Sequence, residues 1–168
     1  SEVLGVKVLG PHYDDMLEAC RENGASLLVN AVGAARNQAL REKISSNIRK
    51  WQFSTPTLIH PSASIEASAK VGEGCQIFAG ARIGSSAAIA NDCIINCNSV
   101  VSHDCNIGDN VHIAPGCILA GHVEVGSNTL IGMGATVYLQ VKIGSQVTVA
   151  NGVNVYKDIE DGKFVKEK

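Results

Sequence analysis

Aromatic side chains are scarce in this sequence, at 4% of 168 residues, although hydrophobic residues make up 45%. A core of packed rings is therefore excluded, and the interior has to be filled by aliphatic side chains. The sequence also lacks an apolar stretch of the ~18 residues that a membrane-spanning helix needs. It opens without the basic and then apolar segment of a secretory signal. We therefore expect a cytoplasmic protein that makes no membrane contact.

An excess of basic charge is missing too, because 14 Lys and Arg face 16 Asp and Glu, for a net charge of -2. Without a basic surface or a Lys/Arg run, nucleic-acid binding is excluded. The six cysteines do not form a disulfide framework, since four of them share one place in a repeat and are predicted to be packing thiols. Cys20 and Cys97 lie outside that rule, without metal-ligand spacing, so we expect no metal.

What the sequence does contain is an aliphatic residue at every sixth position. These residues are Ile59, Ile65, Val71, Ile77, Ile83, Ile89, Ile95, Val101, Ile107, Ile113, Leu119, Val125, Ile131, Val137, Ile143, Val149 and Val155. A small or β-branched residue follows four positions later, and these slots include Cys75, Cys93, Cys105 and Cys117. A helix would repeat at about 3.6 and a strand at 2. Sustained hexads instead predict a mainly β fold, a parallel β-helix of about five to six coils.

Several glycines directly follow the aliphatic residue of a hexad, where we expect corners that need a permissive backbone. They are Gly72, Gly84, Gly108, Gly126, Gly132 and Gly144. Hexad phase also sorts the histidines. His103, His122 and His112 fall at the third, fourth and sixth positions, so all three should face outward, and His122 is as readily explained as a solvated surface residue.

The chain before the hexads predicts a small α/β unit. Apolar runs at 3–9 and 26–32 are typical of strands, and helices are predicted over 13–23 and 36–47, the second with Leu40, Ile44 and Ile48 on one side. This βαβα unit would occupy residues 1–56, the β-helix residues 57–157 and a C-terminal tail residues 158–168. Trp51 and Phe53 are expected to plug the junction between the unit and the rod.

Residues 98–121 carry the most specific motif, Asn-Ser-Val-Val-Ser-His-Asp-Cys-Asn-Ile-Gly-Asp-Asn-Val-His-Ile-Ala-Pro-Gly-Cys-Ile-Leu-Ala-Gly. This block resembles the sialic acid and bacillosamine O-/N-acetyltransferase family of hexapeptide-repeat acyltransferases. The resemblance extends over nearly the whole chain, from the α/β unit to about residue 162. It implies a left-handed β-helix, a homotrimer, and acetyl-CoA as cosubstrate in the groove between neighbouring rods.

The same resemblance implies roles for individual residues. His103 would be the general base that takes a proton from the amine or hydroxyl of a sugar or nucleotide-sugar acceptor, because an imidazole can accept a proton at neutral pH and return it to the leaving thiolate. Asp104 would raise the basicity of that imidazole. His112, Met133 and Asn151 would contact acetyl-CoA, and the backbone N–H of Gly121 would face the thioester oxygen.

In the N-terminal unit, Gly33 matches a strand-end glycine that lines the nucleotide-sugar pocket of the family. The family's preceding Gly-x-Gly-Gly-His turn, which cradles the diphosphate, is not found. We therefore expect the chain to start beyond that turn, and to bind nucleotide sugars weakly for this reason. The acceptor would then be a smaller sugar or amine that reaches His103 directly, or else the natural protein is longer than this chain.

Two other functions stay open at this point. A γ-class carbonic anhydrase-like enzyme shares the rod and the trimer but needs two histidines five residues apart on one chain, whereas His103, His112 and His122 are 9 and 10 apart. A non-catalytic trimeric scaffold is the other alternative. Retention of His103, Asp104, His112 and Gly121 together argues against it.

Overall fold

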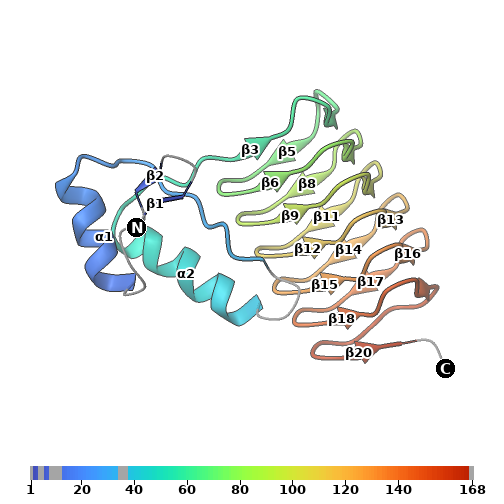
Figure 1. Cartoon of the computed structure of the whole chain (residues 1–168). Coiled ribbons are helices and arrows are strands. Elements are labelled where there is room, and N and C mark those ends of the chain that lie inside the picture. Colours follow the sequence, from blue (N-terminus) through green and yellow to red (C-terminus); the bar gives the residue numbers. More distant parts are fainter. Residues whose placement is uncertain (1, 4–5, 8–12, 34–37, 167–168) are drawn as a thin grey trace.

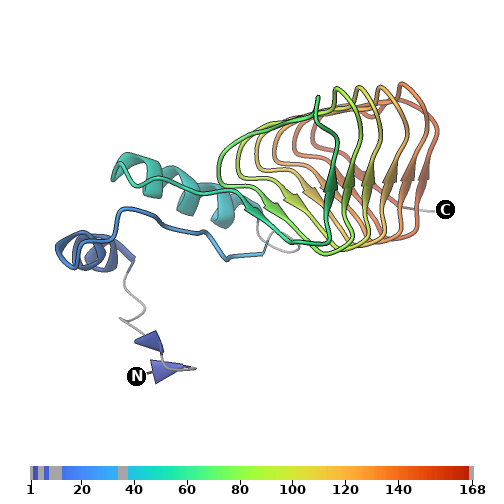
Figure 2. The same cartoon turned by 90° about the horizontal axis from the view of Figure 1, so that it is seen from above.

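The computed structural model describes residues 2–3, 6–7, 13–33 and 38–166. Most of these residues form a rod of stacked β-coils, with a smaller helical unit beside it (Figure 1; Figure 2). The rod is a left-handed parallel β-helix of about six turns, which confirms the predicted fold class. This handedness is an exception to the right-handed crossover that parallel strands usually follow.

Each of the first five coils contributes one two-residue strand to each of three parallel sheets, and β18, β19 and β20 extend two of these sheets further. The seven-stranded sheet contains β3 (Leu58–Ile59), β6 (Gln76–Ile77), β9 (Ile94–Ile95), β12 (His112–Ile113), β15 (Leu130–Ile131), β18 (Thr148–Val149) and β20 (Phe164–Val165). The six-stranded sheet contains β4 (Ser64–Ile65), β7 (Arg82–Ile83), β10 (Val100–Val101), β13 (Ile118–Leu119), β16 (Thr136–Val137) and β19 (Asn154–Val155). The five-stranded sheet contains β5 (Lys70–Val71), β8 (Ala88–Ile89), β11 (Asn106–Ile107), β14 (Glu124–Val125) and β17 (Lys142–Ile143).

Three corners join the sheets, and we name them by position. Corner A joins the six- to the five-stranded sheet and includes residues 102–105 and 120–123. Corner B joins the five- to the seven-stranded sheet and includes residues 90–93 and 108–111. Corner C joins the seven- to the six-stranded sheet and includes residues 114–117, 132–135 and 150–153.

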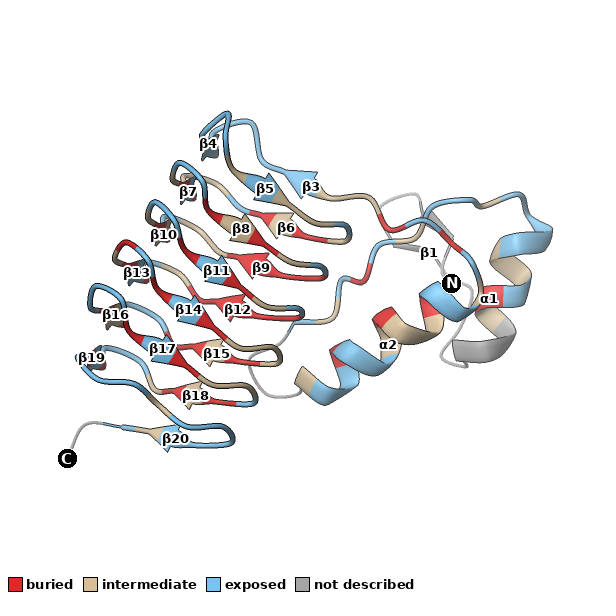
Figure 3. Ribbon diagram, turned by 180° about the vertical axis from the view of Figure 1, so that it is seen from behind, coloured by how far each residue is buried: buried red, intermediate tan, exposed pale blue. Residues whose placement is uncertain are grey.

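The hexad residues stack in register, because each strand pairs with the strand 18 residues further on, as in Ile95 with Ile113 and Ile113 with Ile131. These residues are buried from Ile77 onward, and red marks buried positions along the strands in Figure 3. Four thiols, of Cys75, Cys93, Cys105 and Cys117, fill the small slot and donate to carbonyl oxygens of the next coil at 2.8 to 3.1 Å. Burial raises the pKa of the Cys117 thiol to about 11, so this group packs rather than reacts.

The glycines after the aliphatic residue serve a different purpose from the one expected. Positive backbone φ angles occur at the fourth hexad position instead, at residues such as Asp104 and His122. A Cβ at Gly126 would lie 2.5 Å from the Ser145 nitrogen, and one at Gly132 would lie 2.6 Å from the Val149 oxygen. These glycines are therefore required because the backbone of the next coil passes too close for a side chain.

The N-terminal unit differs from the predicted βαβα order. Its described elements are the antiparallel pair β1 (Glu2–Val3) and β2 (Val6–Lys7), followed by α1 (Tyr13–Glu22) and α2 (Gln38–Lys50). Residues 4–5 and 8–9 of the first predicted strand and 36–37 of the second predicted helix lie outside the described residues. The strand expected over 26–32 is extended chain with a single bridge, between Leu27 and Ser54. A strand needs a continuous partner, and among the described residues only this one pairing is made.

The unit has its own small core, in which Leu17, Ile48 and Phe53 are buried and Trp51 packs against them. Phe53 and Trp51 thus pack inside the unit. The prediction that they plug its junction with the rod was wrong. The buried residues of α2 are Arg41, Ser45 and Ile48, whereas Leu40 is exposed. The predicted apolar face was right for Ile48, which is buried, and for Ile44, which packs against the small core, and it was wrong for Leu40. The neighbouring Arg41 is covered instead, because it makes a polar contact with the rod.

That contact lies at corner B, where α2 runs beside the rod (Figure 1). Arg41 is buried and donates to the backbone oxygens of Asn30, Val32 and Asp92. Arg49 forms an ion pair with Asp92. Arg41 thereby holds the extended segment, the helix and the rod together.

The last coil continues further than expected. The predicted tail at 158–168 contains β20, which pairs with β18, and Ile159, which bridges Ile143. In both pairings the two partners are 16 residues apart instead of 18, as in Thr148 with Phe164. This shorter coil breaks the hexad phase after Val155, which is why periodicity alone did not reveal it. Among the described residues, no helix is both long and apolar enough to cross a membrane.

Candidate active site

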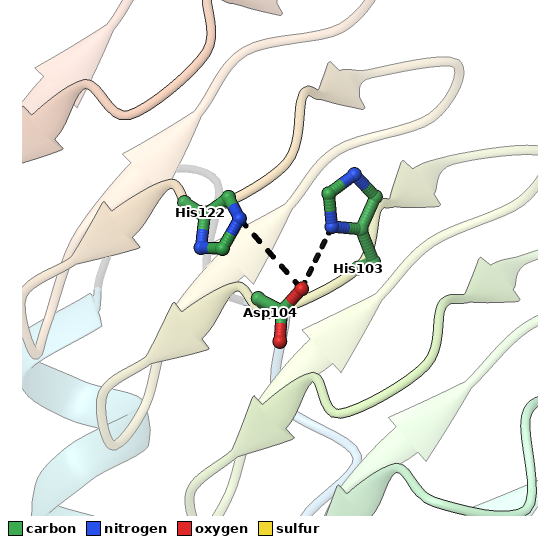
Figure 4. A group of neighbouring side chains, drawn as sticks. All are labelled: His103, Asp104 and His122. Atoms are coloured by element: carbon green, nitrogen blue, oxygen red, sulfur yellow. Dashed lines mark hydrogen bonds and ion pairs between the residues drawn. The ribbon is translucent and has the colours of Figure 1, made fainter.

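Corner A brings together His103, Asp104 and His122 (Figure 4). His103 Nδ1 lies 2.8 Å from Asp104 Oδ2, and His122 Nε2 lies 3.7 Å from the same oxygen. The two imidazole rings meet edge to face, with 5.3 Å between their centroids. All three side chains are about half exposed. The group is therefore accessible from outside the rod.

The repeat itself creates this group. Asp104 and His122 are the fourth residues of their hexads and adopt left-handed backbone angles, with φ of 56° and 57°. They are one 18-residue coil apart, and the backbone N–H of His122 donates to the backbone oxygen of His103 at 3.0 Å. Corner residues of successive coils lie one above another, so groups far apart in the sequence become neighbours.

Gly121 leaves the space in which the His103 ring lies. A Cβ at residue 121 would be 2.5 Å from Cε1 and 2.6 Å from Nε2 of His103. Any side chain at this position would displace the imidazole. The glycine expected near the thioester oxygen is thus adjacent to the candidate base.

The contact with Asp104 sets which nitrogen of His103 is basic. An ionised carboxylate only accepts hydrogen bonds, so Nδ1 carries the hydrogen and donates it to Asp104. Nε2 then has the lone pair and can take a proton from an acceptor. Asp104 can stabilise the imidazolium that results and holds the ring in place.

His112 lies elsewhere, in β12 of the seven-stranded sheet. Its side chain points away from the rod interior, as the hexad phase predicted, but it is only 7% exposed rather than solvent-facing. The reason is that the N-terminal unit lies over this part of the rod (Figure 1). Asn96 Nδ2 lies 3.2 Å from His112 Nε2.

The environment of His112 keeps its ring neutral. Burial, together with the positive charge of Arg41, lowers the pKa of His112 to about 4. The Asn96 amide can then donate to Nε2, which places the ring hydrogen on Nδ1. Nδ1 is buried without a hydrogen-bond partner among the described residues. A neutral, fixed imidazole suits binding better than proton transfer.

The remaining predicted residues lie at other places on the rod. Met133 and Asn151 lie at corner C on adjacent coils, where the Met133 nitrogen donates to Asn151 Oδ1 at 2.9 Å. Both are exposed. Gly33 ends the extended segment of the N-terminal unit, is exposed, and has no atom within 4 Å of an added Cβ.

One chain therefore brings His103, Asp104 and Gly121 together but not the rest of the predicted site. Corner A and corner C are separated by a whole face of the rod, the six-stranded sheet. Sequence reasoning missed His122 as a neighbour of Asp104, although their separation of one coil was the available signal. It also missed Asn96 and Arg41, for which the hexad pattern offers no signal.

A sequence model described as bacterial transferase hexapeptide (six repeats) matches residues 86–121, the stretch that contains the corner A group. A search of curated proteins gave no match.

Solved structures are similar over nearly the whole chain. PerB from Caulobacter crescentus, in complex with CoA and GDP-perosamine, is 40% identical, with a TM-score of 0.89 over 95% of this chain and 74% of that one. The acetyltransferase domain of PglB from Neisseria gonorrhoeae, in complex with acetyl coenzyme A, is 34% identical, with a TM-score of 0.87 over 98% and 77%. WeeI from Acinetobacter baumannii is 26% identical, with a TM-score of 0.89 over 99% and 78%.

Proposed function

We propose, given that this chain belongs to the hexapeptide-repeat sugar acetyltransferases, that it transfers the acetyl group of acetyl-CoA to an amino sugar carried on a nucleotide. PerB is similar over nearly the whole chain, and its structure holds CoA and GDP-perosamine. The single observation that carries the proposal is the His103–Asp104 pair with Gly121 against the imidazole.

The chemistry follows from the tautomer of His103. The acceptor amine attacks the carbonyl carbon of the thioester, so a C–N bond forms, and Nε2 of His103 takes the proton that the nitrogen loses. The C–S bond then breaks, and the proton passes from His103 to the departing thiolate of CoA. Asp104 holds Nδ1–H throughout and stabilises the imidazolium between the two steps.

Gly121 has a second task in this proposal. Its backbone N–H would donate to the oxygen of the thioester as negative charge develops there, and the absence of a side chain lets the thioester approach. Removing one such donor typically costs on the order of 10²–10³ in rate. The contact between residue 121 and the His103 ring supports placing both groups at one reacting carbon.

The coenzyme would extend from corner A to residues that, within one chain, lie elsewhere on the rod. His112, Met133 and Asn151 are the proposed contacts of acetyl-CoA, and Met133 and Asn151 lie at corner C. A coenzyme that touches corner A of one rod and corner C of another would join two chains. We therefore propose a homotrimer in which each site lies between neighbours.

Gly33 and the adjoining segment are the proposed contact with the nucleotide sugar. The segment is anchored to the rod by Arg41 and by Gln76, whose Nε2 donates to the Asn30 oxygen at 2.7 Å. We further propose that the reaction takes place in the cytoplasm, because the six cysteines form no disulfide and a reducing compartment suits free thiols.

The decisive experiment measures release of free CoA from acetyl-CoA with a panel of GDP- and UDP-linked amino sugars, free amino sugars and sialic acids. We expect turnover with one or more nucleotide-linked amino sugars and an amide product by mass spectrometry. Turnover with sialic acid alone would show that the acceptor group is a hydroxyl. Binding of CoA without turnover on any acceptor would favour a scaffold, and hydration of CO2 by metal-loaded protein would favour the carbonic anhydrase alternative.

A further inference from the structure

We propose that His103, Asp104 and His122 form a zinc-binding site, and that zinc bound there switches off the base. The inhibitory part rests on the proposed function, whereas binding does not. Each residue offers one ligand atom, and these atoms lie within 4.8 Å of one another. The group comes from the third position of one hexad and the fourth positions of two, so it is a product of stacking rather than of a local motif.

The distances are close to those that zinc requires. Zinc bonds to nitrogen and carboxylate oxygen of about 2.0–2.2 Å in tetrahedral geometry place neighbouring ligand atoms roughly 3.3 Å apart. The two histidine-to-aspartate distances, 2.8 Å and 3.7 Å, bracket that value. The two imidazoles have to approach each other, which their half-exposed side chains allow by rotation. The backbone at 104 and 122 is held by coil-to-coil hydrogen bonds and does not need to move.

The donor set selects the metal. Two imidazole nitrogens and one carboxylate oxygen are the ligands of catalytic-type zinc sites, which keep a fourth position for water. Mg²⁺ and Ca²⁺ prefer oxygen ligands in greater number, so they should not compete. Site exposure also means that the metal enters without any opening of the rod.

Zinc would act on the base through its tautomer. In the metal-free protein Nδ1 carries the ring hydrogen and Nε2 the lone pair, because Nδ1 donates to Asp104. Zinc takes the lone pair of Nδ1, so the ring hydrogen has to reside on Nε2. An Nε2 that carries hydrogen cannot accept the proton of an acceptor amine. Asp104 is withdrawn from its supporting contact at the same time, because its oxygen ligates the metal.

His122 makes the proposal testable separately from catalysis. It is a zinc ligand here, while the proposed transfer assigns its proton steps to His103. The control residue is His60, an exposed histidine whose Nδ1 lies 2.9 Å from Ser62 Oγ rather than from a carboxylate. Cys20 and Cys97 are the two cysteines that are not buried, so both are replaced by serine in every protein to remove competing thiolates.

The experiment titrates this protein with ZnCl2 by calorimetry and repeats the titration with His122→Asn and with His60→Asn. We expect one zinc per chain, at least tenfold weaker binding by His122→Asn, and unchanged binding by His60→Asn. Zinc should also inhibit acetyl transfer reversibly, a chelator should restore it, and Mg²⁺ should have no effect. Inhibition of His122→Asn should require at least tenfold more zinc.

Equal zinc affinity in His122→Asn and the parent protein would overturn the site, as would an absence of binding in the parent. Inhibition that His122→Asn leaves unchanged would show that zinc acts elsewhere and would overturn the switch. Zinc binding that depends on His122, in a protein that transfers no acetyl group, would leave the metal site standing and refute the proposed function instead.

Discussion

The rod carries two histidine-containing polar groups that differ in their surroundings. His103 at corner A is half exposed and contacts the carboxylate of Asp104. His112, in the next strand of the seven-stranded sheet, is buried under the N-terminal unit and experiences the positive charge of Arg41. Both side chains point away from the rod interior, so hexad phase alone does not separate them. What covers each residue decides what it can do.

The difference teaches how one repeat supports two tasks. An accessible imidazole beside a carboxylate can gain and lose a proton. A buried imidazole beside a guanidinium stays neutral and contributes packing and a fixed hydrogen bond. We therefore expect the first group to govern the rate, and the second group to contribute to stability in addition to the coenzyme contact proposed for His112. The following four predictions test this difference in rate and stability.

The largest effect is expected from the accessible group. His103→Ala should lower the rate of acetyl transfer by about 10²–10⁴, because the proton acceptor is lost. Binding of CoA and the thermal transition should stay near those of the parent, since the side chain is half exposed. Steady-state kinetics, calorimetry with CoA and thermal unfolding measure the three quantities. A loss of less than tenfold would assign the base to another residue.

The next effect concerns the buried group. Arg41→Met should cost on the order of 3–5 kcal/mol in the unfolding of the N-terminal unit, because three backbone oxygens lose a buried charged donor. Trp51 is the one tryptophan of the sequence and lies in this unit, so urea unfolding followed by its fluorescence reports the change. Lys43→Met is the matched control on an exposed position of α2 and should change stability little. Comparable losses in both variants would remove the special role of Arg41.

A smaller effect should appear as pH is lowered. The pKa of His112 is about 4 in the folded protein, below the reference value of 6.5. As the pH falls, His112 is therefore protonated in the unfolded chain before it is protonated in the folded protein. The free energy of unfolding is thus unaffected by His112 above pH 6.5 and decreases progressively as the pH falls towards 4. The loss is worth at most about 3 kcal/mol.

Urea unfolding at pH 7.5, 6 and 5 measures this dependence. His112→Gln should flatten it between pH 6.5 and 4, while His60→Gln, at an exposed histidine, should not. The same slope in the parent and in His112→Gln would contradict a neutral, buried His112.

The smallest effect sharpens the comparison by using one substitution at two glycines. Gly121→Ala should lower the transfer rate about tenfold with little change in melting temperature, because the new Cβ displaces only the His103 ring. Gly126→Ala should instead lower stability, since its Cβ would meet the backbone of residues 144–145. Kinetics and thermal unfolding of both variants give the two readouts. Loss of stability without loss of rate in Gly121→Ala would contradict the contact.

The sequence predicted most of the rod and part of the site. The hexads located every strand from β3 to β19, because the inward residue of each coil has to be aliphatic and the repeat is strict. They failed at β20, where a coil is two residues shorter. The resemblance singled out His103, Asp104 and Gly121, which the structure brings together.

What escaped prediction depended on contacts between parts. The covered side of α2 follows from Arg41 reaching backbone oxygens of the rod and of the extended segment, and no periodicity encodes that. The burial of His112 has the same origin. His122 was within reach of prediction, since residues one coil apart at a corner must lie together. The intervals between histidines were counted along the chain, whereas the informative interval is the 18 residues, one full coil, between Asp104 and His122.

The strict coil also constrains how this gene can change in length. Adding six residues between positions 104 and 122 would carry every later residue one corner around, so His122 would leave corner A altogether. Adding 18 residues there would keep it at corner A but place it two coils away from Asp104 instead of one. Only insertions of whole coils would keep His122 at corner A, and even these would separate it from Asp104. Length variants that keep both histidines in contact are therefore confined to the coils before His103 and after His122.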